Sequence, residues 1–261
     1  MQNNLKFLFI GDIIGKTGRN ALIKEMKQLK EKYSPDMIIA NGENLAGGFG
    51  MTKSTTDSVF SSGVNVLTSG NHIWDNKEYI DLLRDERILR PLNYHPSLQG
   101  RGYALYNVNN MEVCISNLCG RIFMQPLDCP FRKMDELLSL VKTKVVIVDF
   151  HAEATAEKQA FAYYLDGRVS AVIGTHTHCQ TADERILKEG TAFITDVGMT
   201  GSMDSIIGFE PEGAIRRTLF QVPQRFEVAR EKSAINALYF EVESETGKTI
   251  AIERIFKYVN N

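Results

Sequence analysis

The sequence predicts an α/β protein, because short apolar runs rich in β-branched residues alternate with longer stretches of helical periodicity. The length of 261 residues and a hydrophobic share of 43% suit a chain that buries a substantial core of its own. No linker, repeat or low-complexity segment interrupts the alternation. We therefore expect residues 1–261 to form a single α/β domain.

Strands and helices alternate from the start of the chain. The apolar run Leu5–Ile10 predicts a strand, and Thr17–Lys32 predicts a helix because Leu22, Met26 and Leu29 recur at helical spacing. The next predicted elements are the strands Met37–Ala40 and Val64–Leu67 and the helix Asn76–Arg84.

The second half of the chain is richer in β-structure. Tyr103–Val108 and Glu112–Leu118 flank Asn109-Asn110, a pair that tolerates the positive φ of a tight turn, and so predict a hairpin. After the irregular tract Gly198–Glu231, which would form either a pocket lid or an interface, the chain closes with an antiparallel pair. The elements predicted here are the helices Met134–Lys142 and Ala156–Leu165, the latter capped by Gly167, and the strands Val145–Phe150, Ala171–Gly174, Ala192–Thr195, Ile235–Val242 and Thr249–Tyr258.

Charge and apolar runs exclude two classes of protein. A formal net charge of −2 argues against a protein whose main role is to grip the nucleic-acid backbone, since that role needs a basic surplus. Apolar runs such as Phe7–Ile10 and Val145–Val148 fall far short of the ~20 residues of a membrane span, and Met1–Lys6 is unlike a secretion signal. The 4 cysteines lack CxxC spacing, so we expect reduced thiols in a cytoplasmic protein.

Side chains that bind metals or transfer protons follow five of the predicted strands. Because the carboxyl ends of strands in an α/β sheet border the ligand crevice, we expect these side chains to converge there. Four of the 5 histidines are among them, and only His95 lies in an unrelated surface loop. Asn41, also after a strand, is expected to cap a turn. The converging residues are Asp12, Glu43, Asn44, Asn71, His72, His151, His176 and His178.

The donor types in this group indicate a metal centre. Carboxylates, carboxamides and imidazoles without thiolate suit manganese, iron or zinc better than a soft metal. The candidates are too many for one tetrahedral zinc, whereas two metals that share a bridging carboxylate fit their number. Such a pair binds a phosphate and generates a hydroxide nucleophile near neutral pH.

The segment Gly11–Thr17 resembles a phosphate-binding P-loop but departs from it. A P-loop has four residues between its glycines, whereas only the three residues 12–14 separate Gly11 from Gly15. The backbone amides of the shorter loop would not surround a phosphate in the same way. Lys16 and Arg19 nevertheless open a predicted helix, where they would lie near a phosphate.

The segments around the metal-capable residues resemble one enzyme family. Gly11-Asp12, Gly70-Asn71-His72 and the block 174–178 are similar to signatures of the calcineurin-like metallophosphoesterases. More narrowly, six long blocks that run in order through the chain resemble the YmdB-like branch. These blocks are FIGDIIGKTGR (9–19), NGENLAGG (41–48), TSGNHIWDNKE (68–78), HAEATAEK (151–158), GTHTHCQTADERI (174–186) and TDVGMTGSMDSIIGFEPEGAIRR (195–217).

The resemblance implies an αββα metallophosphoesterase sandwich with two metal ions and phosphodiesterase activity on cyclic nucleotides. The implied substrates are chiefly 2′,3′-cyclic nucleoside monophosphates, with 3′,5′-cyclic ones as an alternative. It further implies that His72 is the proton donor. Our mechanistic hypothesis is that a metal-bridging hydroxide attacks the phosphorus while His72 protonates the leaving oxygen. Glu43 would bridge the metals. The implied ligands are Asp12, Glu43, Asn44 and His178 for the first metal, and Glu43, Asn71, His151 and His176 for the second.

The sequence departs from the broad superfamily in ways that bear on the metal. The superfamily's first block has a histidine two residues after the aspartate, where this chain has Ile14, and the resemblance implies that Asn44 replaces that ligand. A carboxamide in place of an imidazole favours iron or manganese over zinc, with magnesium as a further alternative. No acid directly follows His72. Glu153 and Asp183 are expected to orient histidines.

Two other residues near the motifs have structural interpretations. Cys179 stands where the family pattern would place an aliphatic residue, so we expect it to pack rather than to ligate. Trp74, the single tryptophan, is expected to pack on the core, with base stacking or an interface as the alternative.

The partners implied are a small cyclic-nucleotide substrate and further copies of the chain in a homo-oligomer, with no membrane. No stable nucleic-acid complex is expected, although RNA remains an alternative substrate. Two other functions stay open: a regulatory cyclic-nucleotide sensor that uses the same pocket, and a phosphomonoesterase or nuclease of the same superfamily. The Asn71-His72 pair favours an enzyme, since a sensor needs no proton donor.

Overall fold

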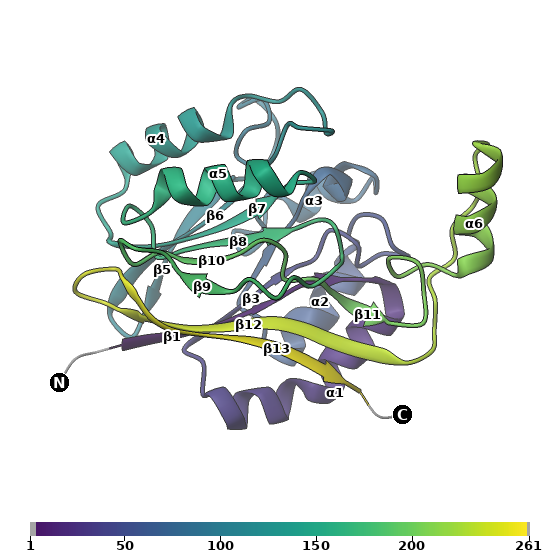
Figure 1. Cartoon of the computed structure of the whole chain (residues 1–261), viewed down its shortest axis with the longest axis horizontal. Helices are drawn as coiled ribbons and strands as arrows, with labels where there is room; N and C mark the ends of the chain where they lie inside the picture. The colour runs from purple at the N-terminus through teal and green to yellow at the C-terminus, as the bar shows by residue number, and fades with distance from the viewer. Residues whose placement is uncertain (1–3, 260–261) are drawn as a thin grey trace.

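The computed structural model describes residues 4–259 and places two sheets face to face between two layers of helices. In Figure 1, α4 and α5 lie above the sheets and α1 lies below them, while α6 stands apart at the right. The predicted α/β class and the αββα order of layers are therefore confirmed.

The first sheet has seven strands in the order β2-β11-β12-β1-β3-β4, with β13 paired to β12. β3 runs parallel to β1 and to β4, whereas β12 is antiparallel to β1, β11 and β13. Its strands are β1 (Asn4–Ile10), β2 (Asp12–Ile13), β3 (Met37–Asn41), β4 (Val66–Thr68), β11 (Met199–Ser202), β12 (Ser233–Glu243) and β13 (Thr249–Tyr258).

The second sheet has six strands in the order β5-β6-β7-β8-β10-β9. Its central strands β6, β7, β8 and β10 are mutually parallel, so their carboxyl ends share one edge. The predicted hairpin is confirmed, because Asn109 and Asn110 turn with φ of 51° and 66° between β5 and β6. The strands are β5 (Tyr103–Val108), β6 (Met111–Cys119), β7 (Val145–His151), β8 (Ala171–Thr175), β9 (Arg185–Ile186) and β10 (Ala192–Ile194).

Alternation along the strands divides the core into three layers. In β1, Phe7 and Phe9 point between the sheets, while Leu8 and Ile10 point toward α1 and α2. The residues of β7 alternate in the same way between the sheet interface and the layer of α4 and α5. Strands buried on both faces explain why the runs are almost continuously apolar. The helices are α1 (Gly15–Tyr33), α2 (Lys53–Ser62), α3 (Tyr79–Leu82), α4 (Pro130–Leu140), α5 (Thr155–Leu165) and α6 (Pro211–Phe220).

Two helices were absent from the sequence prediction, and a third is shorter than predicted. α2 is polar and rich in Ser and Thr, so its sequence lacks an obvious apolar stripe, but Thr52 and Thr55 form a reciprocal cap at its start. α6 lies inside the tract predicted to be irregular. The helix predicted at Asn76–Arg84 is reduced to α3 because Asn76 accepts a hydrogen bond from the backbone of Glu78 and favours a turn.

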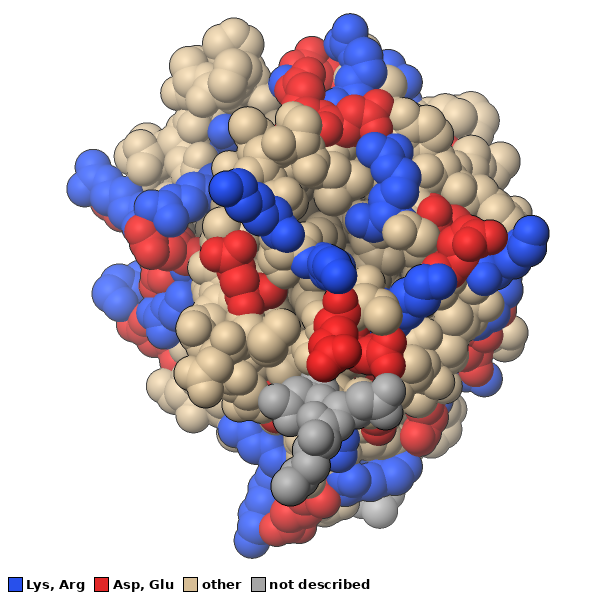
Figure 2. All heavy atoms as spheres, turned by 90° about the vertical axis from the view of Figure 1, so that its left-hand side faces the viewer, with Lys and Arg blue, Asp and Glu red and all other residues tan. Residues whose placement is uncertain are grey.

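The face of the molecule opposite α6 carries mixed charge. Figure 2 shows Lys and Arg interspersed with Asp and Glu across it, without a large region of one sign. Within residues 4–259, no helix is both long and apolar enough to span a bilayer.

Candidate metal centre

The residues predicted to converge lie at the carboxyl ends of strands from both sheets. Asp12 follows β1, and Glu43 and Asn44 follow β3. On the second sheet, His151 is the last residue of β7, and His176 directly follows β8. The centre thus lies where the edges of the two sheets meet, and each sheet supplies part of it. Asn71 and His72, after β4, begin a short 3-10 helix, η1 (Asn71–Trp74).

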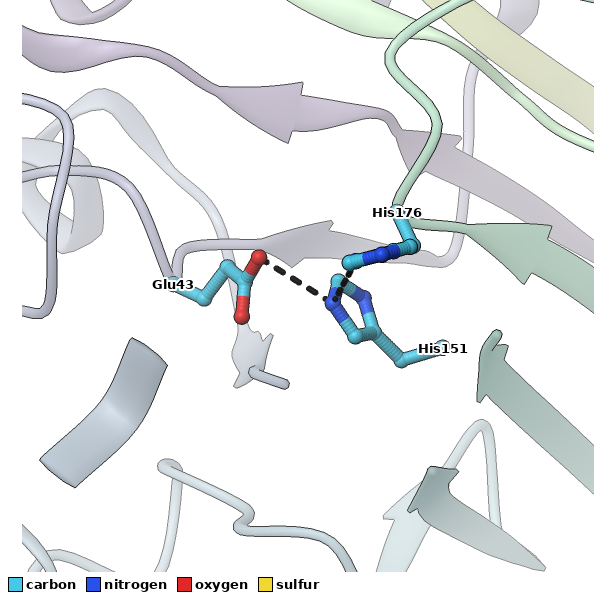
Figure 3. Close-up of side chains that lie close together, drawn as sticks. All are labelled: Glu43, His151 and His176. Carbon is cyan, nitrogen blue, oxygen red and sulfur yellow. Dashed lines mark hydrogen bonds and ion pairs between the residues drawn. The ribbon is translucent and has the colours of Figure 1, made fainter. Parts of the chain in front are cut away.

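One group of candidate ligands joins Glu43 to two histidines. Oε1 of Glu43 lies 3.1 Å from Nε2 of His151, and Nδ1 of His176 lies 2.9 Å from that same nitrogen. Figure 3 shows the carboxylate and the two rings directed toward one point from three separate segments. Ligand atoms from all three residues lie within 4.8 Å of one another, as a shared metal ion would require.

A second group joins the same carboxylate to Asp12 and His178, again with ligand atoms within 4.8 Å. Nε2 of His178 lies 4.0 Å from Oδ1 of Asp12, while its Nδ1 donates to the carbonyl of Ile207 at 2.9 Å. That backbone bond fixes the tautomer and leaves Nε2 as a lone-pair donor. Glu43 belongs to both groups, which is the arrangement expected of a carboxylate between two cations.

Unpartnered buried oxygens test whether the residues fit metal ions. Among the described residues, Oδ1 of Asp12, Oδ1 of Asn44 and Oδ1 of Asn71 are buried and accept no hydrogen bond. A buried acceptor without a partner costs free energy, and native structures rarely leave one without a reason. Gly70 also keeps the space beside these donors open, because a Cβ there would come within 2.3 Å of both Glu43 and His151. The residues present therefore fit cations at this place.

Burial and mutual charge set the protonation of the centre. Burial raises the pKa of Glu43, but the facing His151 outweighs that effect and holds the pKa of Glu43 at about 2. Burial lowers the pKa of His151, yet Glu43 raises it to about 9. Burial raises the pKa of Asp12, and burial together with His151 lowers the pKa of His176 to about 3. A proton on His151 thus supplies the positive charge that the buried carboxylates need.

A network beneath the centre orients His151. The hydroxyl of Thr175 forms a hydrogen bond of 2.8 Å with Nδ1 of His151 and donates another, of 2.7 Å, to the carboxylate of Asp149. Thr68 and Asn41 donate to the other carboxylate oxygen of Asp149 at 2.5 and 2.9 Å. Burial raises the pKa of Asp149 to about 6, although His151 and these hydrogen bonds oppose the rise. Asp149 was missed in the sequence because it lies within an apolar strand.

The loop that carries His176 and His178 has a strained backbone and a buried support. The two histidines have φ of 103° and 64°, values that residues other than glycine adopt at a cost. Between them, Thr177 donates to Asp196 from its backbone at 3.0 Å and its hydroxyl at 2.8 Å. Lys158 on α5 reaches the same carboxylate at 2.7 Å, with both side chains 1% exposed. This ion pair, also missed in the sequence, stabilises the strained loop.

His72 lies beside the metal-capable groups, and its ring is oriented by a carboxylate. Its Nδ1 donates to Asp75 at 2.7 Å, because an ionised carboxylate only accepts. This bond leaves Nε2 available to a ligand. His72, Glu43 and Asn44 line a cavity of ≈ 620 Å³, together with the aromatic ring of Phe49. The orienting acid is three residues after His72 rather than directly after it.

The other expectations for individual residues have mixed outcomes. Glu153 contacts Nε2 of His176 at 3.2 Å, as predicted. Asp183 does not orient a histidine; it accepts hydrogen bonds from Thr181 and Thr195 instead. Cys179 is exposed although the neighbouring His178 is buried, so the prediction that it packs is wrong.

Three residues lie as the sequence predicted. His95 is exposed in a loop, where its ring bonds Ser97. Trp74 packs on the core beside Tyr79. Asn41 caps the turn that follows β3, because its side chain accepts the backbone hydrogen bond of Glu43 at 3.1 Å.

Comparison with known proteins identifies the family. A family model for YmdB-like proteins matches residues 8–255. The chain belongs to the YmdB-like family. It is 45% identical over 254 residues to a 2′,3′-cyclic-nucleotide 2′-phosphodiesterase of Bacillus subtilis (strain 168), and the match covers 96% of each chain. That relative is named for phosphodiesterase activity, the enzyme class expected from the sequence.

Two solved structures share the fold over nearly the whole chain. A hypothetical protein from Thermus thermophilus superposes with a TM-score of 0.93 at 42% identity and covers 97% of this chain and 99% of its own. A protein from Mycoplasma pneumoniae described as a novel phosphatase superposes with a TM-score of 0.95 at 38% identity, over 99% and 95% of the two chains. Both likenesses confirm the sandwich fold predicted from the sequence.

The first prediction concerns the ion pair under the histidine loop. Lys158→Met would leave Asp196 buried without its cation, so we expect the free energy of unfolding of the metal-free protein to fall by about 3–5 kcal/mol. Urea denaturation measures the loss. Lys53→Met, which removes a lysine from the exposed pair with Asp57, is the control and should change stability little. A loss as small as that of the control would show that Lys158 does not support the loop.

Proposed function

We propose that this YmdB-like chain is a two-metal phosphodiesterase that hydrolyses 2′,3′-cyclic nucleoside monophosphates to 3′-nucleotides. The observation that carries the proposal is a single carboxylate, Glu43, shared by two groups of buried donors. The unpartnered oxygens of Asp12, Asn44 and Asn71 add donors for cations. The activity named for the Bacillus subtilis relative supplies the substrate class.

The residues divide into two ligand sets that share Glu43. Asp12, Asn44 and His178 would complete the first set, and Asn71, His151 and His176 the second. When bound, the two cations neutralise charge on the phosphate and activate water for attack. Asn44 and Asp12 make the first set rich in hard oxygen donors, which favours iron or manganese there over zinc.

The chain's own residues act on the leaving group and the substrate. His72 lies at the wall of the cavity with its Nδ1 bonded to Asp75, so its Nε2 would hold the proton that the departing O2′ takes. Phe49, edge-on to His72 at 5.1 Å between ring centroids, excludes water from one side of that imidazole. Attack on phosphorus with cleavage of the P–O2′ bond leaves the phosphate on O3′.

A phosphomonoesterase is the second candidate, since the Mycoplasma pneumoniae neighbour is described as a phosphatase. A panel of 2′,3′-cyclic, 3′,5′-cyclic and linear mononucleotides, with products identified by chromatography, separates the two functions. Our proposal expects 3′-AMP from 2′,3′-cyclic AMP and much slower release of inorganic phosphate. Tight binding of the cyclic nucleotide without any product would instead indicate a sensor.

The second prediction tests His72. We expect His72→Ala to lose about 10²–10⁴-fold in turnover of 2′,3′-cyclic AMP, because the leaving oxygen then departs without a proton donor. The manganese content, measured by elemental analysis, should be unchanged. His95→Ala removes an exposed histidine that does not line the cavity of His72 and serves as the matched control. Full turnover by His72→Ala would rule out the proton-donor role.

The third prediction tests the division of ligands. In calorimetric titration of the metal-free protein with Mn²⁺, Asn44→Ala should weaken one binding event by about tenfold or more, and Asn71→Ala should weaken the other. The reason is that each variant removes an oxygen from one set only. Equal weakening of both events by either variant, or no change, would contradict the division.

A further inference from the structure

A second cavity, which none of the candidate metal ligands lines, is lined by basic side chains. It has a volume of ≈ 770 Å³ and contains Lys16, Arg19, Arg225 and Arg230 against one acid, Glu227. A surplus of three positive charges in one cavity stands out in a chain whose formal net charge is −2. This cavity is referred to below as the basic pocket.

The cations of the basic pocket are available to a ligand. Within residues 4–259, Lys16, Arg225 and Arg230 form no ion pair, and all three are exposed. The face opposite α6 differs, because there basic and acidic side chains are interspersed (Figure 2). The start of α1, a helix of 19 residues without an acid in its first turn, lies at the same cavity and adds to its positive potential. The ligand that fits is an anion.

The basic pocket adjoins the metal centre through one loop and one aromatic ring. Arg19 donates its guanidinium to the carbonyl of Leu45, directly after the candidate ligand Asn44. The loop that supplies Asn44 to the catalytic cavity supplies Ala46 and Gly47 to the basic pocket. Phe226 lines both cavities. A chain-like ligand would therefore pass from one cavity to the other along this loop.

Phe226 belongs to an aromatic cluster that suits a nucleobase. The ring centroid of Phe226 lies 5.0 Å from that of Phe209, and Phe209 in turn stacks on Phe49 with 5.3 Å between centroids. The guanidinium of Arg217 lies 5.2 Å from the ring centroid of Phe226. Aromatic rings and arginine planes are the groups on which unpaired bases stack. The route between the two cavities thus combines a surface for a base with cations for a phosphate.

We propose that the basic pocket binds the internal phosphate of an oligoribonucleotide whose terminal 2′,3′-cyclic phosphate occupies the metal centre. This inference rests on the proposed function and extends its substrate class from mononucleotides to RNA ends. The reaction is unchanged: water adds to phosphorus, the P–O2′ bond breaks, O2′ takes a proton, and the product ends in a 3′-phosphate. The additional phosphodiester is held and is not cleaved.

The experiment compares two substrates with the metal-loaded full chain. The first is 2′,3′-cyclic AMP, and the second is a tetraribonucleotide with a terminal 2′,3′-cyclic phosphate. We expect Arg225→Ala/Arg230→Ala to lower the ratio of kcat/KM for the oligonucleotide over that for cyclic AMP by about tenfold, mainly through KM. The wild-type KM for the oligonucleotide should also rise with KCl more steeply than in the variant.

Arg132→Ala is the matched control, because Arg132 is exposed on α4 and lies outside both cavities. It should leave the ratio and the salt dependence unchanged. If the double variant left this ratio of kcat/KM values unchanged, whether or not both values fell, the proposal for the basic pocket would be overturned. Failure of the wild type to hydrolyse even cyclic AMP would instead overturn the proposed phosphodiesterase function.

Discussion

The structure depends on the burial of two carboxylates, Asp12 and Glu43, where the edges of two sheets meet. Each is almost fully buried, and a charge taken out of water must be compensated by a partner. A proton on His151 meets that need for Glu43, while one oxygen of Asp12 accepts no hydrogen bond from the residues that the structure describes. Bound cations would satisfy the same need more completely, since they would also engage the amide oxygens of Asn44 and Asn71 that accept no hydrogen bond here. The positive charge that the buried carboxylates need is therefore the same charge that the proposed metal ions would bring to the reaction.

The sandwich buries these carboxylates by bringing together short segments from distant parts of the chain. Neither group of candidate ligands comes from one sheet alone, because Asp12 and Glu43 follow strands of the first sheet and the three histidines end or follow strands of the second. The apolar layer between the sheets thus controls the geometry of the centre. Behind the ligands, Asp149 orients His151 and the Lys158–Asp196 pair supports the loop of His176. Packing and polar support act together to fix the donors before any ligand binds.

The sequence allowed the fold and the convergence of the candidate ligands to be predicted, but not the residues that support them. Period-2 and helical patterns marked most elements. The candidate ligands after five of the strands are visible because strand ends can be read locally. Asp149 and Lys158 resemble ordinary members of a strand and a helix, since nothing local reveals that both are buried. Asp183 misled because nearness in sequence to His178 does not give nearness in space. α2 was missed because its cap uses Thr55 instead of the usual acid.

The central claim is that Glu43 lies between two cations, and anomalous diffraction from crystals of the manganese-loaded protein tests it most directly. The account predicts two anomalous peaks per chain, about 3.5–4 Å apart, on either side of the Glu43 carboxylate. Asn44 and Asp12 should approach one peak with the oxygens that are unpartnered here, and Asn71 should approach the other. A single peak, or a pair of peaks that does not contact Glu43, would contradict the account.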